Sequence, residues 1–374
     1  MNNKINLFSI YYGWWKNIDK FIFSIITLLF IIGLFFSLVS TSLIASDRLD
    51  TNNYSFFFKH LTFILMGFLI IFIFSSINQE NLFKISLVIF LLSLIFLALV
   101  PFFGIEVKGS KRWIDFGFFP RFQPIELVKP FLIIFISLVL CNQTYSNLII
   151  KYLFSFCATM MIVLLLILQP DIGQTLLVFF TWSILIFVSG INISILMGIF
   201  VILLLSFSFL IIFIPKFNYI KNRLLSFFDT EAGTLNFQSD KAIESITSGG
   251  FFGKGIGEGT LKNRVPEAHT DYIISVISEE FGVIAIILIL LLFLVFIYSI
   301  LKKVNLENDE RIKLILVGSI SLVLMQAMIH IGVNIRLFPT TGMTLPFISY
   351  GGSSIISVSI LSGIILNLTK RRLN

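Results

Sequence analysis

The chain has 374 residues, of which 57% are hydrophobic and 13% charged, and its formal net charge is +7. Its mean hydropathy is +0.99, and a water-soluble protein of this length could not cover so much apolar surface. The composition therefore excludes a soluble enzyme. It predicts a chain that lies largely in lipid, with no nucleic acid among its partners.

Ten apolar runs follow one another, each long enough to cross a hydrocarbon core of about 30 Å at about 1.5 Å per residue. They cover residues 21–45, 59–76, 82–103, 125–141, 148–168, 174–190, 192–214, 271–301, 312–335 and 349–369. The weakest boundaries lie at 190–192 and at 169–173, where Pro170 would break a continuous helix. We expect one all-α integral membrane domain over residues 1–374, with a long extracytoplasmic loop between helices 7 and 8.

The first apolar run is too long for the core of a signal peptide, so we expect it to be retained as a membrane anchor. The two cysteines, Cys141 and Cys157, fall in or at the ends of apolar runs. They give neither a disulfide framework nor the spacing of metal ligands, and no metal site is predicted from them.

Positive charges predict the orientation of the chain. An even number of spans puts both termini on one side, together with the loop between the eighth and ninth spans. The cations on that side are Lys4, Lys16, Lys20, Lys302, Lys303, Arg311, Lys313, Lys370, Arg371 and Arg372. The positive-inside rule makes this side cytoplasmic. Extracytoplasmic loops are then expected at about 104–124, 215–270 and 336–348.

Two stretches on the opposite side are also basic. Residues 104–129 hold five Lys or Arg, and residues 215–270 hold seven. Cations on the translocated side indicate an anionic ligand there, such as a lipid phosphate or a pyrophosphate. The alternative is that loops of this length tolerate scattered charge.

The first candidate cluster surrounds the start of the fourth span. Arg112 and Trp113 precede it, and Glu126 and Lys129 stand at i and i+3 just inside it, after Pro124. A charge pair at this depth is costly unless it faces a wet cavity or a ligand. Trp113 also suits an aromatic anchor at the membrane interface.

The long polar loop supplies the second and third clusters. Residues 248–259 pack glycines around Lys254, which permits close approach of the backbone to a ligand, although a simple turn explains the spacing as well. The loop then ends in Glu267, His269 and Asp271. Partial desolvation at the membrane boundary would make Asp271 a stronger base, and capping of the next helix is compatible with that role. His269 is a second candidate base or ligand.

Residues 336–354 form the fourth cluster, and their prolines and glycines predict an extended or re-entrant segment that ends near Ser353. Such backbone is tolerated at membrane depth only where protein packs around it or water reaches it. Just before it, Gln326, His330 and Asn334 recur every four residues, which favours hydrogen bonds between helices.

These segments together resemble the SEDS family of membrane glycosyltransferases (shape, elongation, division and sporulation proteins). The matching stretches are 112–114 (RWI), 123–129 (QPIELVK), 169–171 (QPD), 266–273 (PEAHTDYI), 279–282 (EEFG) and 339–354 (PTTGMTLPFISYGGSS). The last motif and residues 238–242 look most like the division branch, with the elongation branch as the nearest rival. Ile125 stands where the family usually has Ser, a change that removes no charged group.

The resemblance implies a polymerase that joins lipid II units into glycan strands outside the bacterial cytoplasmic membrane, at the division septum. Asp271 would deprotonate the acceptor hydroxyl, and undecaprenyl pyrophosphate would leave with inversion at the donor sugar. Arg112 and Lys129 would stabilise the departing charge, while Glu126 would hold Lys129 or share a divalent ion. The further substrate-binding candidates are Trp113, Lys254, Glu267, His269 and Ser353.

The resemblance also implies partners: a class B penicillin-binding protein, as the septal transpeptidase, and other divisome membrane proteins. No cofactor is required by the residues, and Mg²⁺ or Mn²⁺ stays open. Two alternatives from other classes remain. A lipid II flippase or transporter would need helix breaks near the midplane, whereas the prolines and glycines here sit at the outer ends. A scaffold would act mainly by binding partners.

Overall fold

The computed structural model describes residues 7–41, 54–107, 110–117, 120–143, 147–228 and 237–370. Four of the basic residues, Lys4, Lys108, Arg371 and Arg372, lie outside the described residues. The helices are α1 (Leu7–Asn17), α2 (Lys20–Thr41), α4 (Ser55–Ser76), α5 (Gln79–Phe103), α6 (Pro124–Leu140), α7 (Leu148–Leu168), α8 (Ile172–Val188), α9 (Ile193–Phe213), α10 (Asn218–Phe228), α11 (Phe237–Gly249), α12 (Ile273–Val304), α13 (Glu310–Asn334) and α14 (Gly352–Leu368), with short 3-10 turns at Pro215–Phe217 and Leu261–Arg264. Strands β1 (Ile105–Val107) and β2 (Ser110–Trp113) pair antiparallel, with Glu106 opposite Lys111.

Each of the ten predicted apolar runs contains a helix, which confirms the predicted all-α membrane fold, and residues 42–45 of the first run lie outside the described residues. Among the described residues, seven helices are long and apolar enough to cross a membrane by length and composition. The other three, α6, α8 and α14, have 17 residues each and therefore span only about 26 Å. Pro170 lies in the break between α7 and α8, as its position in the sequence predicts.

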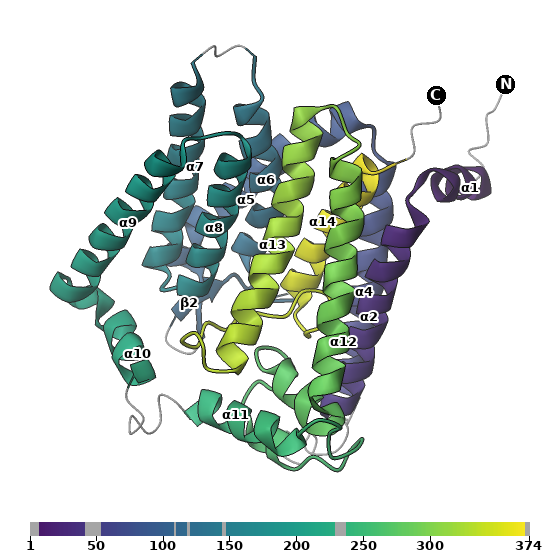
Figure 1. The fold of residues 1–374 in the computed structure, drawn as a ribbon, viewed down its shortest axis with the longest axis vertical. Coiled ribbons are helices and arrows are strands. Elements are labelled where there is room, and N and C mark those ends of the chain that lie inside the picture. Colours follow the sequence, from purple (N-terminus) through teal and green to yellow (C-terminus); the bar gives the residue numbers. More distant parts are fainter. Residues whose placement is uncertain are drawn as a thin grey trace.

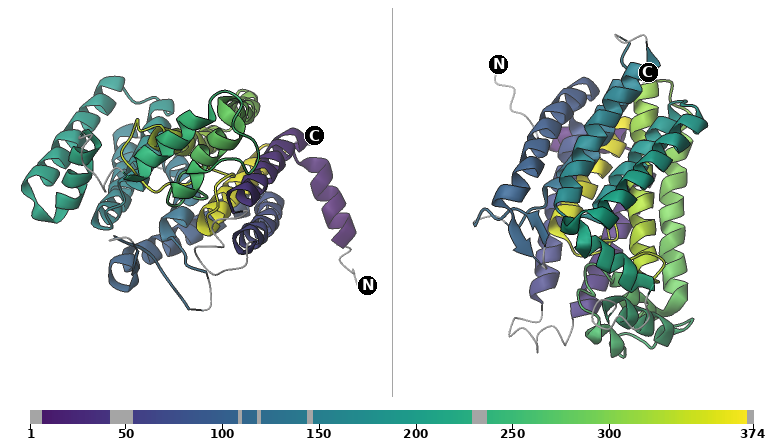
Figure 2. Two further views of the ribbon diagram at one scale, coloured as in Figure 1. Left: turned by 90° about the horizontal axis from the view of Figure 1, so that it is seen from below. Right: turned by 90° about the vertical axis from the view of Figure 1, so that its left-hand side faces the viewer.

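The helices run roughly side by side and give the bundle two distinct ends (Figure 1). Helix α1, the turn between α12 and α13, and the end of α14 lie at one, which we name the terminal end. The β1–β2 hairpin, α11 and residues 250–271 lie at the other, the loop end. Two further views show α1 and α9 at opposite edges of the bundle (Figure 2). The predicted sharing of one end by both termini is therefore confirmed for the described residues.

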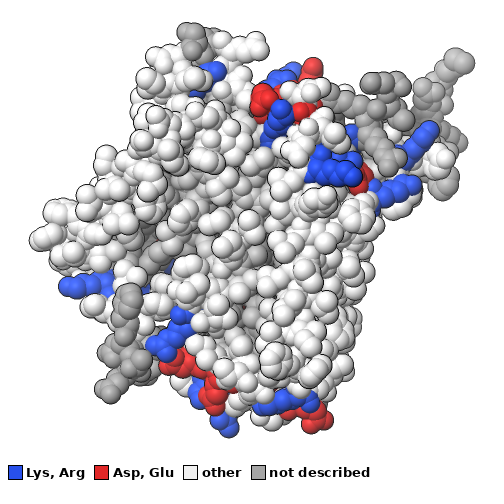
Figure 3. Space-filling model, viewed as in Figure 1, with Lys and Arg blue, Asp and Glu red and all other residues white. Residues whose placement is uncertain are grey.

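Charge follows the same division. On the face shown in Figure 3, Lys, Arg, Asp and Glu gather near the two ends and leave a broad uncharged band between them. Large apolar side chains are exposed along the membrane-length helices α9 and α12, among them Leu204, Leu288 and Leu294. Such exposure is expected of a chain whose solvent at that level is lipid.

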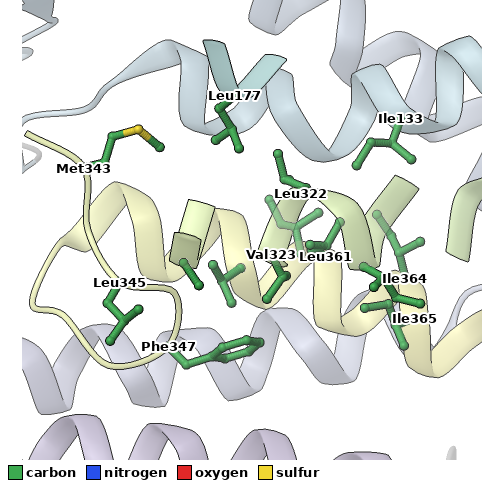
Figure 4. Packing of buried hydrophobic residues seen from close by; sticks show 14 of the residues in the cluster. Ile133, Leu177, Leu322, Val323, Met343, Leu345, Phe347, Leu361, Ile364 and Ile365 are labelled. Atoms are coloured by element: carbon green, nitrogen blue, oxygen red, sulfur yellow. The ribbon is translucent and has the colours of Figure 1, made fainter. Parts of the chain in front are cut away.

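Helix α14 forms the centre of the bundle, because every residue from Ser353 to Leu368 is buried except Ile356, which is partly exposed. It packs on α4, α6 and α13. The segment before it is irregular, yet Met343, Leu345 and Phe347 insert into the core beside the helices (Figure 4). Phe347 meets the ring of Phe30 at 5.4 Å. The predicted re-entrant segment is thus confirmed, and protein surrounds it as its polar backbone requires.

Candidate functional site

A cavity of about 490 Å³ opens at the loop end of the bundle. Its wall includes residues at or beside the starts of six helices, among them α6, α8, α12 and α14. Three of these are the short helices of the fold, and α12 is the fourth. Because the N-terminus of each helix carries partial positive charge and unsatisfied N–H groups, four converging N-termini favour an anionic ligand.

The cavity wall carries charge of both signs. Its cations are Arg112, Arg121 and Arg223, and its carboxylates are Glu126, Glu267 and Asp271. Trp113, His269 and Ser353 also line it. The structure therefore gathers seven of the nine residues singled out from the sequence, drawn from segments far apart in the chain. Lys129 and Lys254 are the two that it leaves out of the wall.

Asp271 lies half-buried at the point where the polar loop meets α12. Its backbone oxygen accepts a hydrogen bond from Asn334 Nδ2 at 3.0 Å. One carboxylate oxygen lies 3.5 Å from the place that a Cβ atom on Gly342 would occupy, so the side chain faces the re-entrant segment. Tyr272, and not Asp271, occupies the N-cap position of α12. Asn334 therefore holds the backbone of Asp271, and the Asp271 carboxylate lines the cavity beside the re-entrant segment.

Glu267 and His269 surround Asp271 in the same turn. Thr270 Oγ1 donates to Glu267 Oε2 at 3.2 Å. The His269 ring lies 4.9 Å from the ring of Phe56 and 5.9 Å from that of Tyr350. The backbone N–H of Tyr350 donates to His269 O at 3.1 Å, which ties this turn to the residues just before α14.

Arg112 joins the hairpin to the break between α7 and α8. Its Nε lies 3.4 Å from Gln169 O and 3.6 Å from Asp171 Oδ2, and its Nη2 donates to Pro170 O. Asp171 caps α8 by accepting from Gln174 N at 3.4 Å and is only 2% exposed. Burial raises the pKa of the Asp171 carboxyl, while the Arg112 charge opposes that rise. Asp171 thus supports the cavity wall from behind, with Arg112 in front of it.

Glu126 and Lys129 form a buried ion pair, as their i, i+3 spacing predicts, with Lys129 Nζ 2.8 Å from Glu126 Oε1. Gln174 Nε2 donates to the same Glu126 oxygen at 2.9 Å, and Lys129 also donates to Gln326 Oε1 at 3.2 Å. Glu126 reaches the cavity, whereas Lys129 is 2% exposed and lies behind it. The expectation that Lys129 faces the ligand is therefore not met in this structure, because Glu126 lies in the first turn of α6 and Lys129 lies one turn deeper in the bundle.

The polar stripe on α13 makes hydrogen bonds outside its own helix, but these go mainly to non-helical chain and not, as its spacing predicts, to other helices; among its bonds within the described residues, only the Lys129–Gln326 bond joins two helices. Gln326 Nε2 donates to Thr344 O at 3.0 Å, and His330 Nδ1 lies 2.7 Å from Met343 O. Asn334 completes the stripe through its bond to Asp271 O. Each contact satisfies a backbone carbonyl of non-helical chain inside the bundle. The stripe therefore fixes the re-entrant segment and Asp271 relative to one helix.

Ser353 and Trp113 have different places in the wall. Ser353 Oγ accepts from the backbone N–H of Gln123 at 3.2 Å and so joins the starts of α6 and α14. Trp113 ends strand β2, opposite Ile105. Both residues line the cavity, so Trp113 does more than anchor the chain at the membrane interface.

The glycine-rich loop lies against α12 instead of a ligand. Gly282 breaks that helix with a φ of 75°, and Lys254 N donates to Glu279 O at 2.8 Å beside the break. Lys254 Nζ lies 3.4 Å from Glu279 Oε1, so an ion pair also holds the loop to the helix. The expectation that Lys254 binds substrate is not met here, because the glycines bring the loop backbone onto the helix break and carry Lys254 with it.

The close packing of the glycine-rich loop on α12 can be tested by a substitution at Gly253. A Cβ at Gly253 would lie 2.2 Å from Glu280 O, and its φ of +78° is unfavourable for other residues. We expect Gly253→Ala to lower the thermal unfolding temperature, with a destabilisation on the order of 1–3 kcal/mol or more. Gly198→Ala is the matched control, because nothing lies within 4 Å of a Cβ there. Equal melting curves for the two variants in detergent would contradict the close packing.

Several cavity residues were not singled out as site residues from the sequence. Gln174, Thr341, Tyr350 and Phe56 contribute to the wall, and Arg223 had been noted only as a loop cation. Arg223 Nη1 donates to Thr340 O at 2.9 Å, across 117 positions of sequence. Gln174 had one local signal, since it lies one helical turn after Asp171. Thr341 and Tyr350 lie within the motif of residues 339–354, whereas nothing local distinguishes Phe56 and Arg223.

Comparisons with known proteins agree with this geometry. Residues 19–374 match the sequence profile of a family described as "Cell cycle protein", which joins FtsW, RodA and SpoVE. A probable peptidoglycan glycosyltransferase FtsW of Caulobacter vibrioides is 31% identical over 359 residues, covering 96% of this chain and 91% of the relative.

Two solved structures have the same fold. One comes from work on the structural coordination of polymerization and crosslinking by a peptidoglycan synthase complex. It aligns with a TM-score of 0.76 and 24% identity, over 94% of this chain and 97% of that one. The other is the rod shape determining protein RodA of Thermus thermophilus, with a TM-score of 0.68 and 23% identity over 94% and 96%.

Proposed function

We infer the activity from the family to which this chain belongs, that of the FtsW, RodA and SpoVE cell cycle proteins, known as SEDS proteins. The chain is a multi-pass membrane peptidoglycan glycosyltransferase, as its FtsW relatives are named. Its substrate is lipid II, which it joins into glycan strands. The observation that carries this proposal is a half-buried acid, Asp271, in a cavity where arginines and four helix N-termini favour a pyrophosphate.

The reaction is a displacement at the anomeric carbon of the donor sugar. Asp271 takes the proton from the acceptor hydroxyl, and the oxygen of that hydroxyl forms the new glycosidic bond to the anomeric carbon. The bond from the anomeric carbon to the pyrophosphate oxygen breaks, and undecaprenyl pyrophosphate leaves with both electrons of that bond. A single displacement inverts the configuration at this carbon. Glu267 and His269 bind the sugars beside Asp271.

Stabilisation of the leaving group falls to Arg112, Arg121 and Arg223. A guanidinium matches phosphate geometry through paired N–H donors, and preorganised donors lower the barrier for a developing anion. Lys129 lies behind the cavity wall and acts through Glu126, because its Nζ lies 2.8 Å from Glu126 Oε1 and holds that carboxylate in place. Trp113 and Ser353 shape the wall against which the substrate lies.

A divalent ion fits this cavity only together with the substrate. The described residues contain no group of three or more His, Cys, Asp or Glu that could hold one. Glu126 Oε2 and Gln174 Oε1 are buried and have no hydrogen-bond partner among the described residues. These two oxygens would hold Mg²⁺ or Mn²⁺, which commonly combines one or two protein carboxylates with substrate phosphates. The ion would supply neutralisation of the pyrophosphate charge.

The cellular setting follows from the same relatives. Those named FtsW support a role in division at the septum over the elongation role of RodA. Among known assemblies, the peptidoglycan synthase complex supports a partner that crosslinks what this chain polymerises. We assign that partner as a class B penicillin-binding protein, within a group of other divisome membrane proteins.

The test is conversion of labelled lipid II by the purified full chain, alone and with a class B penicillin-binding protein, in lipid vesicles. Glycan strands should form and undecaprenyl pyrophosphate should be released in equal amount to the bonds made. Movement of lipid II across the vesicle membrane without strand formation would favour the transporter instead. Neither activity, from folded protein with its partner, would favour a scaffold.

Arg112→Ala should lower kcat/KM for lipid II by roughly 10²-fold, the usual scale for a preorganised donor to a developing anion. Arg311→Ala is the control, since Arg311 pairs with Asp309 at the terminal end, far from the cavity. Because Arg112 also braces Asp171, thermal unfolding is measured in parallel. Normal turnover by a folded Arg112 variant would remove this residue from the mechanism.

Orientation is tested with single cysteines. We propose that the terminal end is cytoplasmic and the loop end outside, from the distribution of cations. Thr260→Cys and Asn305→Cys place exposed thiols at the two ends. Ser239, within α11, is unsuitable because it is buried. An impermeant thiol reagent should label Thr260→Cys in intact spheroplasts and spare Asn305→Cys, with the native Cys141 and Cys157 as background. The reverse pattern would place Asp271 in the cytoplasm and exclude the reaction above.

A further inference from the structure

Two adjoining cavities lie at the terminal end, opposite the proposed reaction site. One, of about 410 Å³, lies between α2 and α12 and includes Phe21, Val295 and Lys302 in its wall. The other, of about 360 Å³, lies where α1 meets α2 and includes Lys16 and Lys20. The two share Asp19 and Phe21 in their walls and therefore adjoin, and we name them together the basal groove.

The upper rim of the basal groove is strongly positive. Four lysines line it: Lys16, Lys20, Lys302 and Lys303. Among the residues that the structure describes, Asp19 is the one carboxylate in its wall, and it already pairs with Lys303 at 2.7 Å. Figure 3 shows blue side chains beside α1 and the adjoining helix ends, with little red among them. A net positive rim with its acid neutralised attracts an anion.

Below the rim the groove is apolar. Phe21 is 60% exposed and Tyr298 69% exposed, and Val295 and Ile22 lie beside them. These residues belong to α2 and α12, both long and apolar enough to cross the membrane. The groove therefore runs from the charged rim into the level of the hydrocarbon, along a surface that acyl chains contact.

Helix α1 continues the same boundary. It turns away from the bundle instead of running along it (Figures 1 and 2). Trp14 fixes it by donating from Nε1 to Ser75 Oγ at 2.7 Å, while Tyr11 and Tyr12 stay exposed. Lys20 Nζ lies 5.5 Å from the centre of the Trp15 ring. Exposed aromatic side chains next to lysines are typical of a helix that lies in the headgroup region of a bilayer.

We propose that the basal groove binds one anionic phospholipid. Its phosphate lies among Lys16, Lys20 and Lys302, and one acyl chain lies against the exposed side chains of Phe21, Val295 and Tyr298. The lysines alone would fit any phosphate, but the apolar floor in line with the spans commits the site to a lipid. A zwitterionic lipid would place its own cation among the lysines and is disfavoured.

The test is native mass spectrometry of the full chain titrated with phosphatidylglycerol, with phosphatidylcholine of the same acyl chains, or with inorganic phosphate. The wild type should retain one phosphatidylglycerol in preference to phosphatidylcholine. The double variant Lys20→Gln, Lys302→Gln should bind phosphatidylglycerol roughly tenfold more weakly, since each lysine near a membrane surface adds to anionic lipid binding. Its affinity for phosphatidylcholine should not change.

The matched control is Lys84→Gln, Lys151→Gln, which removes two lysines from the starts of α5 and α7, outside the basal groove. It should bind phosphatidylglycerol as the wild type does. Equal loss in both double variants would reduce the effect to net charge and overturn the site. Displacement of the lipid by millimolar inorganic phosphate would overturn the lipid assignment, as would equal binding of the two lipids by the wild type.

Discussion

Asp271→Asn should reduce glycan synthesis by a factor on the order of 10² or more, the usual scale for a positioned general base. The amide keeps the size of the carboxylate but cannot accept the proton of the acceptor hydroxyl. The assay is strand formation from labelled lipid II by the purified variant with its partner. Near-normal polymerisation would remove Asp271 from the role of base.

The contacts around Asp271 make this variant a clean test. Asn334 binds the backbone oxygen of Asp271, and that bond does not depend on the carboxylate. A neighbouring acid provides the control, because Glu258→Gln changes an exposed carboxylate of the same loop that does not line the cavity. Glu258→Gln should polymerise normally. Thermal unfolding of both variants separates loss of chemistry from loss of fold.

Lys129→Met should destabilise the protein by about 3–5 kcal/mol, because it leaves the buried Glu126 without its cation. The expected signs are a lower unfolding temperature in detergent and loss of activity together. An ordinary substrate-binding lysine would instead weaken lipid II use at unchanged stability. That second outcome would contradict the placement of Lys129 behind the cavity wall.

The double variant Glu126→Gln, Lys129→Met separates the two roles of this pair. Removing both charges should restore much of the stability, since no unpaired ion then remains in the bundle. Activity should stay low, because Glu126 is the member that lines the cavity. A double variant as unstable as Lys129→Met would show that the methionine side chain, and not the unpaired charge, causes the loss.

Local chemistry in the sequence was sufficient for some elements of the site. The polar stripe of Gln326, His330 and Asn334 predicted hydrogen bonds to other parts of the bundle, and all three residues make them, although to irregular chain and not to helices. The i, i+3 spacing of Glu126 and Lys129 predicted their pairing. These inferences held because helical periodicity alone decides which side chains share a face.

Other elements could not be read from local patterns. The glycines of residues 249–259 permit either a ligand or a neighbouring backbone to approach, and only the break at Gly282 decided for the backbone. Arg223 and Tyr350 entered the cavity through chain segments far from Asp271 in sequence. No periodicity links residues that meet only after the helices have packed.

The sequence by itself determined the helices of the ten apolar runs, the placement of α1 and the end of α14 at one end of the bundle, and the resemblance that singled out Asp271. Apolar length suffices for this, because each membrane helix satisfies its own backbone hydrogen bonds before it meets another. Tertiary structure alone decided that α14 lies at the centre, that Lys129 and Lys254 turn away from the cavity, and that four helix N-termini converge on it. Lipid tails are as apolar as a helix interface, so hydropathy cannot tell a lipid-facing side from a packed one, and the arrangement follows from close packing and from polar contacts between distant segments.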